Sequence, residues 1–229
     1  MTKPSKFSRF FEVSGPFVAV ALIVCWIIAL YVVGTEKHQG EVYRIIYLHV
    51  PAAFTAFTCS FILFIQSILL LKKGKGSVQY FGRACAEVGL IFTVLTLATG
   101  SIWGKPTWGT WWTWDARLTT TFLLGLMYGA YLLLWNSMDS GPDRNKACAV
   151  LGILIFVDVP IIYKSVTWWR TLHQPPSIMR DGGSTMAPEI LTLVLTAAFL
   201  SIFVSLWMTW SRYENLKLRE QVESQSISS

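Results

Sequence analysis

Two of the three histidines in the chain flank a stretch that is unusually rich in tryptophan. His49 lies in the string YLHVPAA and His173 in WWRTLHQPP, and residues 103–119, WGKPTWGTWWTWDARLT, lie between them. Neutral imidazole is a good ligand for iron, and aromatic side chains form flat apolar walls. One histidine at an interface is usually just a hydrogen-bonded residue. Two histidines on separate elements beside such a stretch favour a ligand site.

The stretch contains five tryptophans within twelve residues: Trp103, Trp108, Trp111, Trp112 and Trp114. The spacing of Trp108, Trp111, Trp112 and Asp115 predicts a short interfacial helix with one aromatic face. Such a face could receive a flat apolar ligand, or the helix could simply lie among lipid headgroups. The residues alone leave both interpretations open.

A porphyrin would require more than aromatic walls. One imidazole on each side of the macrocycle would fill both axial positions of its iron, and a guanidinium matches a carboxylate in bidentate fashion. Four arginines are placed to provide that charge: Arg44, Arg117, Arg170 and Arg180. Asp115 and Arg117, with Thr119, could equally cap the helix that follows them.

The composition indicates a membrane protein. The 229 residues are 53% hydrophobic and 14% charged, whereas soluble domains carry roughly 25% charge. The net charge of +6 comes from basic residues in short loops beside apolar runs, which argues against nucleic acid as a partner. The four cysteines form no CxxC motif, and the chain contains no GxxxxGK[ST] phosphate loop, so neither a zinc site nor ATP hydrolysis by that route is indicated.

Six apolar segments are long enough to cross a bilayer, which requires about 20 helical residues. They cover roughly residues 16–34, 47–71, 79–101, 118–137, 147–164 and 188–210. The sequence therefore predicts an all-α integral membrane protein with a single six-helix domain, residues 1–210. Residues 211–229 are expected to form a polar cytoplasmic tail, which we expect to be frayed over residues 213–229.

The distribution of lysine and arginine predicts the orientation of these helices. Most of these residues lie in the two tails and near 72–83 and 144–146, so both termini are expected in the cytoplasm. The connections 35–46, 102–117 and 165–187 then face outward, which is the periplasm in a Gram-negative cell. The tryptophan-rich loop, residues 102–119, joins the third and fourth helices on that outer side.

Three features inside the apolar segments call for an interpretation. Pro51 is expected in the opening turn of its helix, where its missing N–H is harmless. Arg83 and Glu87 are four residues apart and are expected to pair on one helix face. Asp158 has no partner in the sequence, and we expect it to be protonated and hydrogen-bonded rather than part of a proton relay.

The string WGTWWTWDARLT resembles the tryptophan-rich signature of the WWD family of heme-handling membrane proteins. The six-helix length, YRIIYLHVPAA and WWRTLHQPP make the chain similar to the members that act in cytochrome c maturation, over about residues 16–210. The resemblance implies heme b as a non-covalent, transferable cargo on the periplasmic face of the bacterial inner membrane. It implies axial ligation by His49 and His173, a pocket formed by the five tryptophans and Asp115, and propionate binding by Arg117 or Arg44.

The resemblance also implies partners. Family members of this kind pass heme to a periplasmic chaperone, cytochrome c maturation protein E, and work beside ATP-binding cassette transporter subunits CcmA and CcmB and the small membrane protein CcmD. It implies binding and delivery rather than catalysis, and leaves open whether the protein assists covalent attachment of heme to the chaperone. The alternatives are a permease subunit, a heme-containing membrane oxidoreductase, or a zinc site formed by His38, His49 and His173. His38 matches no motif of the family.

Overall fold

The computed structural model describes residues 5–36, 39–73, 78–178 and 182–228, and they are almost entirely helical. The elements, in order, are α1 (Lys6–Ile27) with a π turn (Ile28–Val32), a 3-10 turn (Glu41–Ile45), α2 (Ile46–Lys73), α3 (Val78–Trp108), α4 (Ala116–Ser137), α5 (Pro142–Trp168) and α6 (Pro188–Ser228). The described residues contain six helices long and apolar enough to cross a membrane, which confirms the predicted fold class.

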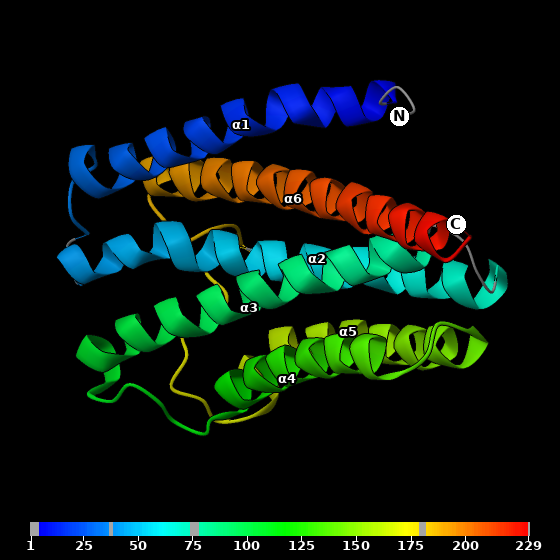
Figure 1. Ribbon diagram of the computed structural model, residues 1–229. Coiled ribbons are helices and arrows are strands. Elements are labelled where there is room, and N and C mark those ends of the chain that lie inside the picture. The colour runs from blue at the N-terminus through cyan, green and yellow to red at the C-terminus, as the bar shows by residue number, and fades with distance from the viewer. Residues whose placement is uncertain (1–4, 37–38, 74–77, 179–181, 229) are drawn as a thin grey trace.

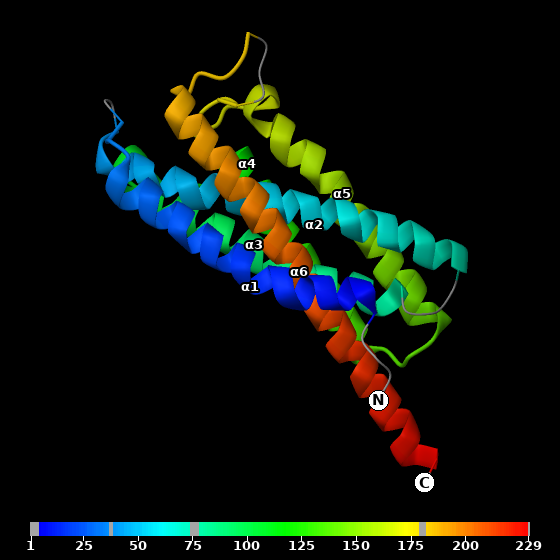
Figure 2. The same ribbon diagram turned by 90° about the horizontal axis from the view of Figure 1, so that it is seen from above.

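The helices form a layered bundle in which α2 is central (Figure 1). α2 packs against α3, α5 and α6, while α1 packs on the outer side of α6 and α4 packs between α3 and α5. α1 begins and α6 ends at the same end of the bundle, as Figures 1 and 2 show. We call the opposite end, where α3 joins α4 and α5 joins α6, the tryptophan end. The shared side of the two termini agrees with the predicted topology.

Several helices extend beyond the apolar segments that the sequence predicts, and the third and sixth do so at their C-terminal ends. The third helix continues through Lys105 and Pro106 to Trp108, and Gly109, at φ +78°, then ends it. The short separate helix expected over residues 108–115 is therefore wrong: Trp108 closes α3, and the chain from 109 to 115 is not helical. A left-handed glycine is a common helix terminator, and this one interrupts the helical spacing that suggested the prediction.

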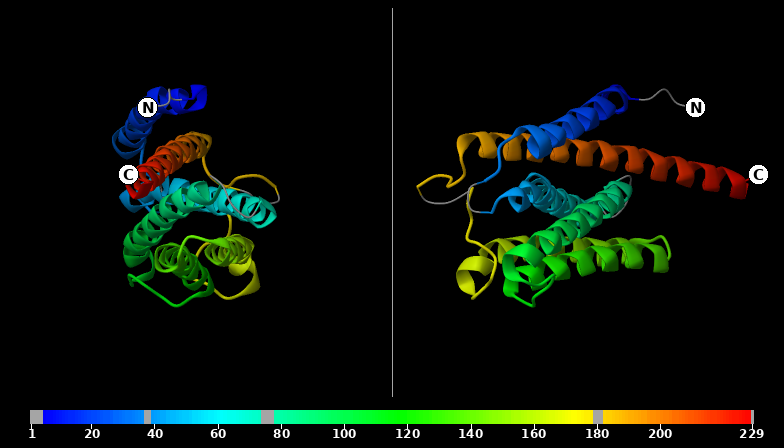
Figure 3. Two further views of the ribbon diagram at one scale, coloured as in Figure 1. Left: turned by 45° about the vertical axis from the view of Figure 1, so that its right-hand side comes forward. Right: turned by 90° about the vertical axis from the view of Figure 1, so that its left-hand side faces the viewer.

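The expectation of a frayed tail is also wrong, because α6 continues as a helix to Ser228 and projects beyond the other helices (Figure 3). Ion pairing explains part of this extension. Arg212 of α6 donates to Glu87 of α3, with Nη2–Oε1 at 3.0 Å, and Glu87 also accepts from Arg83 at 3.1 Å. The predicted Arg83–Glu87 pair is confirmed, and Leu216, one turn further along α6, is buried.

A glycine lets α3 and α4 approach closely. A Cβ atom at Gly89 of α3 would overlap the ring of Tyr128 of α4, whose side chain is fully buried. The Tyr128 hydroxyl lies 2.9 Å from Ser60 Oγ of α2, so one contact links three helices. Close backbone approach of this kind is the usual means of helix association in a membrane, where apolar burial contributes little.

Pro51 is not in a harmless position, because α2 begins five residues before it. A proline within a helix cannot donate to the carbonyl four residues earlier, here that of Tyr47. The indole N–H of Trp26 on α1 donates to that carbonyl at 3.1 Å. The freed backbone group thereby fastens α1 to the opening turns of α2, next to His49.

Gly89→Ala is expected to destabilise the bundle by about 1–3 kcal/mol, because the added methyl group must displace the buried Tyr128 ring. Gly129→Ala is the matched control: Gly129 also lies within a helix, but a Cβ there would meet no atom within 4 Å. It should leave the free energy of unfolding unchanged or raise it slightly. Unfolding in mixed micelles measures both, and equal effects of the two substitutions would contradict this packing account.

Candidate heme site

The structure brings His49 and His173 together at the tryptophan end from elements distant in sequence. His49 lies in the first turn of α2, and His173 lies in the connection between α5 and α6. Both side chains line the same two adjoining chambers. The His173 ring centroid lies 6.3 Å from those of Trp103 and Trp108, so it faces the aromatic end of α3.

The contacts of His49 fix its tautomer. Its Nδ1 lies 3.1 Å from the carbonyl oxygen of Thr96 and 3.1 Å from Thr99 Oγ1, both on α3. A carbonyl can only accept, and the Thr99 hydroxyl donates to Leu95 at 2.7 Å, so Nδ1 must carry the proton. The neutral ring therefore keeps the lone pair on Nε2, which is the arrangement of a metal-binding histidine.

Gly100 makes room for that ring. A Cβ atom at Gly100 would lie 3.1 Å from His49 Cε1, a closer approach than side chains normally make. Thr96, Thr99 and Gly100 thus form a seat for His49 on α3. Sequence analysis did not identify these residues; the signal available was the TxxTG pattern in the turns of α3 before the tryptophans.

His173 has the same arrangement of nitrogens. Its Nδ1 lies 2.9 Å from the Gln174 carbonyl oxygen, an acceptor, which leaves the lone pair on Nε2. Burial, followed by the positive charge of Arg117, lowers the pKa of His173 from 6.5 to about 4. The imidazole is therefore neutral at physiological pH and able to bind a metal.

The two chambers meet at the histidines. The tryptophan chamber lies between α2, α3 and α4 and is lined by Trp103, Trp108 and Trp112. The strap chamber lies along α2 and Tyr163 of α5 beneath the segment Gln174–Ile178. Six residues line both chambers: His49, Ala53, Phe57, Trp103, Arg117 and His173. A flat ligand centred between the imidazoles would therefore extend into both spaces.

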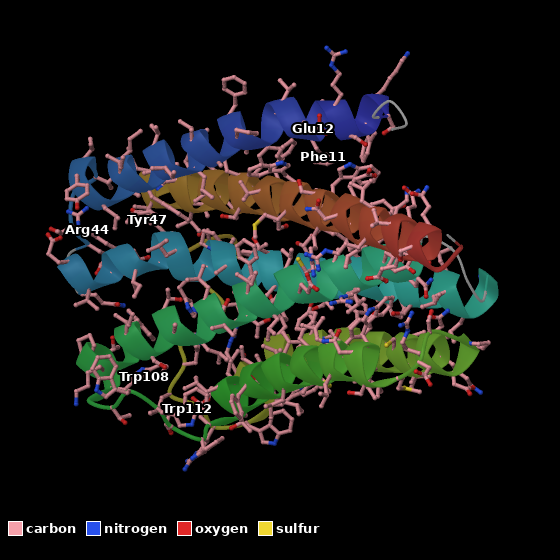
Figure 4. All side chains as sticks on the ribbon, viewed as in Figure 1. Phe11, Glu12, Arg44, Tyr47, Trp108 and Trp112 are labelled. Carbon is pink, nitrogen blue, oxygen red and sulfur yellow. The ribbon has the colours of Figure 1, made fainter. Side chains whose placement is uncertain are left out.

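The five tryptophans predicted for the pocket divide into two groups. Trp103, Trp108 and Trp112 line the tryptophan chamber, with Trp108 and Trp112 at the end of α3 and just beyond it (Figure 4). Trp111 and Trp114 are 57% and 71% exposed and line neither chamber. Trp114 instead packs edge-on against Trp112, with ring centroids 5.4 Å apart, so it supports a lining residue from outside.

The two predicted propionate-binding arginines have different environments. Arg117 lines both chambers, and the described residues give its guanidinium no ion-pair or hydrogen-bond partner. Arg44 lines neither chamber. Its Nη1 donates to the carbonyls of Ala29 at 3.0 Å and Val33 at 2.8 Å, closing the end of the first helix (Figure 4). The structure thus brings Arg117 to the histidines and gives Arg44 a structural contact.

Asp115 holds two elements of the site together. Its Oδ1 accepts from the Leu118 amide at 2.9 Å, which caps α4, and its Oδ2 accepts from Thr171 Oγ1 at 2.7 Å and the Leu172 amide at 3.2 Å. The His173 amide in turn donates to Thr171 Oγ1 at 3.1 Å. Asp115 is outside the chambers, yet it fixes the segment that carries His173 against the start of α4.

The comparisons with known proteins identify the family. The family model described as heme exporter protein C matches residues 1–228. The chain belongs to the heme exporter protein C family. It is 37% identical to the heme exporter protein C of Bradyrhizobium diazoefficiens over 224 residues, which is 96% of this chain and 85% of the relative. It is 35% identical to the heme exporter protein C of Escherichia coli over 221 residues, 92% of this chain and 87% of the relative.

A plant relative extends the comparison. The chain is 37% identical over 181 residues to the putative cytochrome c biosynthesis ccmC-like mitochondrial protein of Marchantia polymorpha, covering 76% of this chain and 77% of the relative. The membrane-spanning architecture and the family together place the chain among multi-pass membrane proteins of cytochrome c biogenesis.

Two sequence candidates, His38 and Arg180, lie outside the described residues. In the part of the chain that the structure describes, no group of three His, Cys, Asp or Glu side chains could hold a metal ion. The proposed third zinc ligand was His38, so that alternative stays untested. Arg170 is exposed and lines neither chamber.

Asp115→Asn is expected to loosen the His173 segment while leaving the α4 cap in place. Asparagine caps a helix as well as aspartate does, but its Nδ2 cannot accept from Thr171 and Leu172. Hydrogen exchange over residues 169–178 should quicken about tenfold or more, as expected for a lost bond to a charged acceptor. Asp143→Asn, in the first turn of α5 at the other end, is the control; unchanged exchange in Asp115→Asn would contradict the anchoring role.

Proposed function

We propose that the protein binds heme b non-covalently at the tryptophan end, with His49 and His173 as axial ligands, and presents it to a periplasmic heme chaperone. The observation that carries the proposal is the pair of Nε2 lone pairs left free at the boundary of two chambers. A macrocycle has its metal at the centre and apolar area on all sides. Two histidine ligands at the boundary of two chambers would match that shape, because the metal would lie between the histidines and the apolar area would extend into both chambers.

The relatives supply the biological context of the proposal. The names of the bacterial relatives describe heme export, and that of the Marchantia polymorpha relative describes cytochrome c biosynthesis. On this proposal the site faces the periplasm from the bacterial inner membrane, as the distribution of lysine and arginine predicts. Cytochrome c maturation protein E receives the heme, and the protein acts beside the transporter subunits CcmA and CcmB and the small protein CcmD.

A transferable cargo requires a site of intermediate strength. The axial bond of His173 can be broken by moving one segment, because His173 lies on a connection rather than on a helix. Contacts that a partner makes with that connection could therefore replace the axial bond of His173. The chain has no phosphate-binding loop, so we infer that energy for release comes from a partner. On this proposal the protein binds and delivers heme, and whether it assists covalent attachment of heme to the chaperone stays open.

The alternative functions have less support. A membrane oxidoreductase would hold heme at membrane depth, whereas His49 lies in the first turn of its helix and His173 lies in a connection. A permease subunit would require polar groups along a path. Asp158 of α5 is buried, with Oδ2 unpaired among the described residues, but it lines neither chamber. Among the described residues, its Oδ2 lacks the hydrogen bond that the sequence led us to expect, and its protonation state stays a prediction.

His49→Ala and His173→Ala are each expected to abolish the low-spin bis-histidine optical spectrum of heme bound to purified protein. The corresponding glycine variants should regain that spectrum on addition of imidazole, because the free ligand can enter the vacated position. The rescue separates lost ligation from misfolding. If both alanine variants kept the spectrum of the unaltered protein, the ligand assignment would be wrong.

The low pKa of His173 predicts how heme binding depends on pH. In His49→Ala, where His173 is the remaining axial ligand, a proton competes with iron for Nε2 only when the pH falls to about 4. Ferric heme affinity should therefore be level from pH 7 to 5 and fall about tenfold per pH unit below the pKa. Optical titration with heme measures this affinity at each pH. A decline that already begins near pH 6.5 would show that the pKa of His173 is not lowered.

A further inference from the structure

The central helix α2 presents a ridge of three side chains to both chambers. His49, Ala53 and Phe57 follow one another at intervals of four residues, which places them on one face of the helix. On the flanks of this α2 ridge, Phe54 lines the strap chamber alone and Ala56 lines the tryptophan chamber alone. The α2 ridge is therefore the boundary between the two chambers on this side of the site.

Ala53 is the lowest point of the α2 ridge, because a single methyl group stands there between an imidazole and a phenyl ring. Ala53 is partly exposed, whereas its neighbour Ala52 is buried in the apolar core at 2% exposure. Since Ala53 lines both chambers, its exposed surface lies where the two spaces meet. The chambers thus connect across Ala53.

An axial bond from His49 would bring a macrocycle very close to α2. Metal–imidazole bonds are about 2 Å long, and carbon atoms of a flat ring approach other carbon atoms to about 3.5–4 Å. A side chain on a helix points back toward the preceding turn, so the side chain of residue 53 occupies the space beside the His49 imidazole. A disc held by His49 Nε2 therefore has room at this place only if residue 53 is small.

We propose that Ala53 determines whether the site admits a macrocycle: the disc lies across the α2 ridge at Ala53, with part of its area in each chamber. Trp103, Arg117 and His173 line the same boundary from the other elements, so the disc passes between them and Ala53. A larger side chain at residue 53 would divide the site into two separate spaces. This inference rests on the proposed function, and it adds the position of the cargo relative to α2.

The test is a size series at residue 53 in the purified full-length protein, titrated optically with ferric heme. Affinity should fall with side-chain volume, by several-fold in Ala53→Val and about tenfold to a hundredfold in Ala53→Leu. Without heme, Ala53→Leu should be as stable to unfolding in mixed micelles as the unaltered protein or more stable, because the added carbon atoms enter open space. Ala130→Leu is the matched control, since Ala130 is exposed on α4 and lines neither chamber.

Three results would overturn the inference. Equal heme affinity across the series would show that the disc does not cross α2 at Ala53. Loss of stability in heme-free Ala53→Leu would show that the Ala53 methyl group packs against protein instead of opening on the chambers. Equal loss of affinity in Ala130→Leu would mean that added bulk anywhere in the bundle weakens binding. Absence of heme binding by the unaltered protein would instead refute the proposed function, and this inference with it.

Discussion

The site depends on one constraint: a buried imidazole must satisfy one nitrogen with an acceptor, and this choice decides which nitrogen remains for a ligand. For His49 the acceptors are the Thr96 carbonyl and the Thr99 hydroxyl of the neighbouring helix, and for His173 the acceptor is the carbonyl of the next residue. Both choices protonate Nδ1 and leave Nε2 free. On the proposed function, the two rings are thereby prepared as metal ligands before heme binds.

The bundle maintains this constraint with contacts of quite different strength. His49 is fixed from several directions, because α2 packs between α3, α5 and α6 and Trp26 ties its opening turns to α1. His173 is held by a connection whose main anchor is the carboxylate of Asp115. One histidine is thus part of the rigid core, while the other is held by a few hydrogen bonds, an arrangement that on the proposed function suits delivery of a cargo.

The sequence was sufficient for the features that periodicity and composition determine. The six spanning helices and the shared side of the termini followed from apolar length and basic residues, and the Arg83–Glu87 pair followed from helical spacing. The structure also brings His49, His173 and Arg117 together, as the resemblance implied. Their roles as ligands stay predictions.

Features that depend on tertiary contacts could not be predicted. Spacing alone predicted that Trp111 and Trp112 lie on one aromatic face. It could not show that Gly109 ends the helix and that Trp111 turns outward. The sequence does not distinguish Arg44 from Arg117 as a propionate-binding candidate. Only the structure shows that the Arg44 guanidinium donates to the carbonyls of Ala29 and Val33. The seat formed by Thr96, Thr99 and Gly100 could not be predicted without knowing which face of α3 meets α2.

The central claim, that two preset Nε2 atoms bind one iron, is tested most directly by pulsed electron paramagnetic resonance of the ferric heme complex with histidine labelled with ¹⁵N at Nε2. The account predicts strong coupling of the iron to two labelled nitrogens, and coupling to none or to only one would contradict it.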